Sequence, residues 1–139
     1  MKKYILFICG YNSGRSQMAE LYFNTHNANP DIEAKSCGTA IKGDKKINPK
    51  IVELLFKKGI DIHNQDRKYT PKMITREMLE NAEQVFTMGC LCTDGDILTE
   101  SQVDYDFCLD DPAKDDTDID AMFEKFQTQI GPVLKKYNS

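Results

Sequence analysis

Residues 9–16 read Cys-Gly-Tyr-Asn-Ser-Gly-Arg-Ser, which places an arginine six positions after a cysteine. The segment stands between the apolar run at 4–8 and a helical pattern. A turn between a strand and a helix points backbone N–H groups inward and adds the positive end of the helix dipole, so it can hold a tetrahedral oxyanion. Arg15 would donate two parallel hydrogen bonds to such an anion. The same positive field favours the thiolate of Cys9, a candidate nucleophile.

The spacing alone is weak evidence, because a buried cysteine beside a surface arginine produces the same pattern. Two properties of the intervening residues favour anion binding. Glycines relieve steric limits where the backbone folds around a ligand, and short polar side chains can hold the loop or hydrogen-bond the sulfur. The anion contacts are therefore expected from Gly10, Tyr11, Asn12, Ser13, Gly14, Arg15 and Ser16.

A candidate proton donor stands in the acidic motif Asp110-Asp111-Pro112. A thiolate that attacks an oxyanion expels an oxygen, and that oxygen needs a proton. Proline restricts the backbone beside the acid, so a carboxyl group can be held over the loop. By itself the motif is equally well explained as an acidic turn ahead of the last helix.

The chain has five cysteines, an odd number that suits a reducing cytoplasm better than a disulfide framework. Cys37 and Cys108 stand at the ends of predicted strands, where a cysteine commonly acts as a small buried hydrophobic residue. Cys90 and Cys92 lie instead in a polar segment rich in glycine and aspartate. A thiol in such a segment can move and react, so these two are candidate redox residues.

Length and charge limit the other classes of function. At 139 residues the chain is expected to be one domain, 1–139. Its formal net charge of −4 argues against nucleic acid as a partner, and no apolar stretch is long enough to cross a membrane. His26 and His63 are isolated in polar surroundings, so we expect no metal and no cofactor.

Alternating strand and helix patterns must position these groups. Strands are predicted at 4–8, 32–37, 84–88 and 103–109, and helices from the loop to about 26, between 48 and 59, near 75–79 and from about 118 onward. Gly131 and Pro132 are expected to kink or end the last helix. The alternation predicts an α/β fold with a four-stranded parallel sheet and helices on both faces.

The loop and several later segments resemble the low-molecular-weight protein tyrosine phosphatases and the arsenate reductases that share their fold. Residues 13–20 look like the reductase branch, and residues 36–39, 47–62, 85–88 and 109–113 are similar to family segments in the same order. The resemblance implies a three-layer sandwich around the parallel sheet. It also implies arsenate or phosphate as the bound oxyanion.

Roles for particular residues follow from this resemblance. The aspartate directly before the proline, Asp111, would be the general acid, with Asp110 as the fallback. Arsenate reductases carry a second cysteine in the place of Cys90 and often a third a few residues later, and these thiols pass a disulfide to thioredoxin or another thiol reductant. This chain departs from the pattern in having only one residue between Cys90 and Cys92, and a disulfide across that spacing is strained.

Three functions are thus compatible with the sequence. The favoured one is an arsenate reductase, in which Cys9 attacks arsenate and a relay through Cys90 and Cys92 completes the reaction. The alternative is a low-molecular-weight protein tyrosine phosphatase that hydrolyses aryl phosphates through a phosphocysteine at Cys9, which Tyr11 at the loop rim would favour. A silent oxyanion-binding module would lack Arg15 or Asp111, and both are present.

Overall fold

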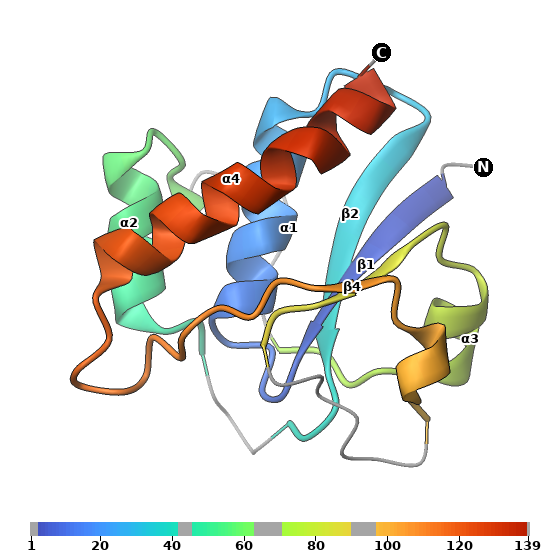
Figure 1. Ribbon diagram of the computed structural model, residues 1–139, viewed down its shortest axis with the longest axis horizontal. Coiled ribbons are helices and arrows are strands. Elements are labelled where there is room, and N and C mark those ends of the chain that lie inside the picture. Colours follow the sequence, from blue (N-terminus) through green and yellow to red (C-terminus); the bar gives the residue numbers. More distant parts are fainter. Residues whose placement is uncertain (1–2, 42–45, 63–70, 90–96, 139) are drawn as a thin grey trace.

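The computed structural model describes residues 3–41, 46–62, 71–89 and 97–138. Four parallel strands form one sheet in the order β2-β1-β3-β4, as the sequence predicts (Figure 1). They are β1 (Lys3–Cys9), β2 (Ile32–Gly38), β3 (Val85–Thr87) and β4 (Tyr105–Asp106). Parallel strands all end at the same edge of a sheet, so the segments that follow them meet there.

Helices cover both faces of the sheet and complete the three layers that were predicted (Figure 1). α1 (Arg15–His26), α2 (Pro49–Lys57) and α4 (Ile119–Asn138) contribute to the larger core, and α3 (Arg76–Glu80) to the smaller one. Successive side chains of a strand point to opposite faces. In β1, Ile5 and Phe7 therefore join the larger core, whereas Leu6 and Ile8 join the smaller one.

The ends of the short helices agree with the sequence signals. The Asn48 side chain accepts a hydrogen bond from the Lys50 N–H at 2.9 Å and caps α2. The Thr75 hydroxyl caps α3 by accepting from the Met78 N–H at 3.1 Å. Gly59 follows α2 with a φ of 85°, a left-handed conformation that favours glycine and stops the helix.

Two predicted boundaries differ from the structure. The strand expected at 103–109 is reduced to β4, which follows the 3₁₀ helix η2 (Glu100–Gln102), because it pairs only with two residues of the short β3. Past β4 the chain turns at Cys108, where φ is 53°. The last helix also runs through Pro132 to Asn138 rather than ending near 131. Val133, Leu134 and Tyr137 still pack against the larger core, and this packing favours the continued helix.

Candidate active site

Cys9 ends β1, and its sulfur lies in the loop that connects this strand to α1. The Asn12 N–H donates to the Cys9 Sγ at 3.2 Å, and the Ser16 Oγ lies 2.8 Å from the same sulfur. Cys9 is only 4% exposed, so the loop holds the candidate nucleophile at the floor of a cavity.

Buried polar side chains hold this loop from behind. Asn12 adopts a left-handed backbone, with a φ of 51°, and its side-chain amide donates to Ser16 Oγ at 2.8 Å and to Ser36 Oγ at 3.0 Å. Ser36 donates in turn to Glu20 at 2.9 Å, and the Gln17 amide donates to the Asn12 carbonyl at 2.8 Å. All of these side chains are fully buried, so Asn12 and Ser16 shape the loop from below. The other predicted anion contacts line the cavity: Gly10, Tyr11, Ser13, Gly14 and Arg15.

Arg15 opens α1 and reaches toward the chain that follows β4. Its Nη1 donates to the Leu109 carbonyl at 2.7 Å. Gly14 precedes the helix as its N-cap residue and makes no side-chain cap, so no capping side chain covers the positive end of the helix dipole. A cationic side chain and a helix N-terminus therefore meet at the loop that holds Cys9, as an oxyanion site requires.

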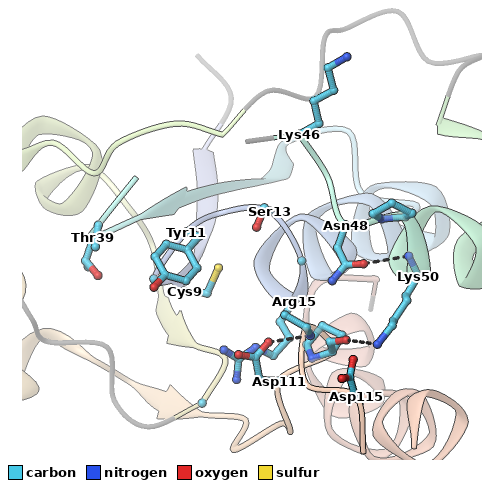
Figure 2. A pocket seen from close by; sticks show the side chains of 17 residues that line it. Cys9, Tyr11, Ser13, Arg15, Thr39, Lys46, Asn48, Lys50, Asp111 and Asp115 are labelled. Carbon is cyan, nitrogen blue, oxygen red and sulfur yellow. Dashed lines mark hydrogen bonds between the residues drawn. The ribbon is translucent and has the colours of Figure 1, made fainter. Parts of the chain in front are cut away.

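A cavity of about 550 Å³ lies over the loop (Figure 2). The loop forms its floor, and Tyr11, 38% exposed, stands at the rim. Its walls come from the segments that follow the other strands and from the start of α2: Thr39, Ala40, Lys46, Asn48, Pro49, Lys50, Gly89, Asp111, Pro112, Ala113 and Asp115. Residues far apart in the sequence thus converge at the carboxyl edge of the sheet, as is usual for ligand sites in α/β proteins.

The structure distinguishes the two candidate acids by position. Asp111 lines the cavity, whereas Asp110 is exposed and is not one of the lining residues. The segment that carries Asp111 is tied to α2, because the Lys50 ammonium donates to the Pro112 carbonyl at 3.0 Å. Pro112 itself is buried beside the loop between β1 and α1, where a Cβ added to Gly14 would lie 3.3 Å from the Pro112 Cγ. The Asp111 carboxyl is therefore placed over the same cavity as Cys9.

Gly38 shapes the site, a structural role that was not predicted from the sequence. A Cβ at Gly38 would lie 2.6 Å from the Gly10 carbonyl oxygen and 3.0 Å from the Asn12 nitrogen. The end of β2 therefore packs directly under the loop, at a distance that only glycine allows. A glycine immediately after a predicted strand, at the edge where ligands bind, is the signal that could have indicated this contact.

The cysteines occupy different surroundings. Cys90 and Cys92 lie outside the described residues, although Gly89, which precedes Cys90 in sequence, lines the cavity. Cys37 is fully buried in the smaller core, as expected. The same expectation for Cys108 is wrong, since this residue is exposed. β4 ends before it, and the left-handed turn at Cys108 takes it out of the strand pattern.

Burial raises the pKa of the Cys37 thiol to about 12, with further upward contributions from Cys9 and Glu20 against the opposing charge of Lys72. Because the folded pKa lies above the ordinary value of 9.0, the protonated thiol favours folding fully below pH 9, and this contribution is lost as the pH rises toward 12. Relative to Cys37→Ala, the wild-type free energy of unfolding should fall by about 1.4 kcal/mol per pH unit in this window. Urea unfolding of both proteins from pH 8 upward would measure it, and a constant difference would contradict the buried-thiol interpretation.

Two features are absent from the described part of the chain. Across residues 3–41, 46–62, 71–89 and 97–138, no group of three or more histidine, cysteine, aspartate or glutamate side chains could hold a metal ion. In the same residues no helix combines the length and the apolar character needed to span a membrane.

The comparison with protein families agrees with the loop, the cavity and the sheet. The model of the family described as low molecular weight phosphotyrosine protein phosphatase matches residues 4–137. The chain belongs to this family. The resemblance predicted from the loop and from the later segments is thereby confirmed over nearly the whole chain.

Within the low-molecular-weight phosphatase family, the similar proteins include arsenate reductases. An arsenate reductase of Shouchella clausii is 34% identical over 140 residues, which cover 98% of this chain and 95% of the relative. Among solved structures, an arsenate reductase in the phosphate binding state has a TM-score of 0.73 and 26% identity, covering 97% of this chain and 98% of that one. A thioredoxin-dependent arsenate reductase of Corynebacterium glutamicum has a TM-score of 0.71 and 26% identity, covering 98% of this chain and 62% of that one. The likeness to the reductase branch is thus confirmed.

Proposed function

We propose that this chain is a single catalytic domain that reduces arsenate to arsenite with its own thiols. The observation that carries this choice is the similarity to an arsenate reductase over 98% of the chain. The cavity supports it, because Cys9, Arg15 and Asp111 line one space large enough for a tetrahedral oxyanion. These are the groups that thiolate attack on an oxyanion needs: a nucleophile, a cation and an acid.

In the first step, the loop and Arg15 hold arsenate and the Cys9 thiolate attacks arsenic. A sulfur–arsenic bond forms and an arsenic–oxygen bond breaks. Asp111 gives its proton to the departing hydroxyl group of hydrogen arsenate, which leaves as water. The backbone N–H groups and Arg15 stabilise the charge that remains on the other oxygens.

In the second step, a second thiolate, assigned to Cys90, attacks the Cys9 sulfur. A disulfide bond forms and the sulfur–arsenic bond breaks, and its electron pair stays on arsenic, which leaves as arsenite. The two cysteines lose two electrons and arsenic gains two. The position of Gly89 supports the assignment of Cys90 to this role, because Gly89 lines the cavity and Cys90 is the next residue in the chain.

A thiol reductant must then reduce the disulfide. A structural neighbour is described as a thioredoxin-dependent arsenate reductase, so we propose thioredoxin as the first partner to test, with other thiols as alternatives. Cys92 could pass the disulfide outward, but its spacing from Cys90 makes a direct bridge between the two strained. We further propose that the protein works in the reducing cytoplasm, where such reductants act.

Cys90→Ser is expected to stop multiple-turnover arsenate reduction while leaving any aryl phosphate hydrolysis nearly unchanged. Water, rather than a thiol, completes hydrolysis, so only the reductase loses a required group. Cys92→Ser should have a milder effect. The assay measures arsenite release with thioredoxin, thioredoxin reductase and NADPH, beside hydrolysis of an aryl phosphate.

The exposed Cys108 offers a matched control, because Cys108→Ser removes an exposed thiol outside the proposed relay. Mass spectrometry after one turnover should find Cys9 joined to Cys90 or Cys92. If all thiols stayed free, and the double variant Cys90→Ser,Cys92→Ser reduced arsenate at the normal rate, the internal relay would be wrong.

The second candidate function is hydrolysis of aryl phosphates, which Tyr11 at the cavity rim favours. An exposed aromatic ring beside the nucleophile can stack on the ring of a substrate. Wild-type activity on an aryl phosphate without any arsenate reduction would establish this alternative.

A further inference from the structure

We infer that Gly89 is a positioning residue for Arg15, since the lack of a side chain at this position lets the guanidinium lie against the backbone at the end of β3. The inference rests on the proposed function, because it concerns the same oxyanion site. It adds a residue from the segment after β3 to Cys9 and Arg15, which the loop motif supplies.

The Arg15 guanidinium and the Leu109 carbonyl, which are hydrogen-bonded to each other, occupy the space beside Gly89. A Cβ at this position would lie 2.5 Å from the Arg15 Nη1 and 2.8 Å from the Leu109 carbonyl oxygen. It would also lie 3.6 Å from the Arg15 Cζ. Arg15 Nη1 and the Leu109 oxygen are the atoms that bond to each other at 2.7 Å. Any side chain at 89 must therefore displace the guanidinium, the carbonyl or both.

The two displaced groups would respond differently. The guanidinium ends a flexible side chain and can move at small cost to folding, whereas the Leu109 carbonyl belongs to the backbone. Leu109 bonds through its own N–H to the Met88 carbonyl at 2.8 Å, directly before Gly89. Arg15 is thus the group expected to yield first, with a small loss of stability and a large loss of oxyanion binding.

Displacement of Arg15 should weaken oxyanion binding strongly, because the binding depends on the orientation of the guanidinium. A guanidinium binds an oxyanion through a planar fork of two donors, and a shifted fork loses one or both of them. Gly131 provides a contrast, since a Cβ there would meet nothing within 4 Å. Position 89 thus requires glycine because Arg15 and the Leu109 carbonyl fill the space that a Cβ would need. Gly131 in α4, where that space is open, offers a matched control.

The test compares Gly89→Ala with Gly131→Ala, using inorganic phosphate as the probe and calorimetry to measure its dissociation constant. Gly89→Ala should bind phosphate about 10- to 100-fold more weakly, the range for loss of a charged hydrogen bond. Gly131→Ala should bind within about twofold of wild type. Circular dichroism would verify that each variant is folded.

A double variant separates displacement of Arg15 from a general distortion. If Gly89→Ala acts through Arg15, then Gly89→Ala,Arg15→Ala should bind phosphate no more weakly than Arg15→Ala alone. Losses that multiply would overturn the inference, as would normal phosphate binding by Gly89→Ala when Arg15→Ala binds weakly. Normal binding by Arg15→Ala, or no binding by wild type, would overturn the proposed function and the inference together.

A measurement on the wild-type protein decides the matter if Gly89→Ala does not fold. With phosphate bound, NMR should show nuclear Overhauser effects between the Gly89 α-protons and the Arg15 side chain. Their absence would mean that Arg15 does not rest on Gly89 when the site is loaded, and the inference would be wrong.

Discussion

Replacing Cys9 by serine should abolish both arsenate reduction and aryl phosphate hydrolysis and leave the fold intact. A serine hydroxyl is nearly the same size, but at neutral pH it supplies almost no anionic nucleophile. The hydroxyl can still pair with Ser16, whose oxygen lies 2.8 Å from the native sulfur, so the loop should keep its shape. Arsenite release, aryl phosphate hydrolysis and thermal unfolding would be measured on the same preparation.

Phosphate binding provides the control for this variant. The backbone N–H groups and Arg15 remain, so Cys9→Ser should still bind inorganic phosphate. Either activity at a wild-type rate would disprove the role of Cys9. Loss of phosphate binding together with activity would instead mean that the loop has collapsed.

Asp111→Asn should lower the rate of the first chemical step by about 10²- to 10⁴-fold, the usual contribution of general acid catalysis. The amide has the same shape but cannot protonate the departing oxygen. Because the Lys50 contact to the Pro112 carbonyl involves the backbone, the segment should keep its place, and phosphate binding should persist. Single-turnover formation of the Cys9 adduct would give the rate.

Asp110→Asn is the matched control, since it removes the same charge from the adjacent, exposed residue. Its effect should be small, because Asp110 is not among the residues that line the cavity. A larger loss in Asp110→Asn than in Asp111→Asn would move the acid role by one position.

The sequence by itself determined the features of this protein that depend on neighbouring residues. The loop that holds Cys9 follows from the order of strand, glycine-containing turn and helix around residues 9–16. The start of α2 follows from Asn48 ahead of Pro49, and its end from Gly59. Caps, turns and periodic apolar patterns act over a few residues, so one stretch of sequence contains their whole physical cause.

Only the tertiary structure decided which distant groups meet over the loop. The bond from Arg15 to the Leu109 carbonyl joins residues 94 positions apart, and the bond from Lys50 to the Pro112 carbonyl spans 62. The close packing at Gly38 and Gly89 likewise comes from strands brought together by the sheet. Such contacts depend on strand order and on the path of each segment beyond its strand, and no local pattern encodes a distance across the fold. For this reason the motif could indicate an oxyanion site, whereas the position of Asp111 over the cavity and the space for Arg15 beside Gly89 required the assembled chain.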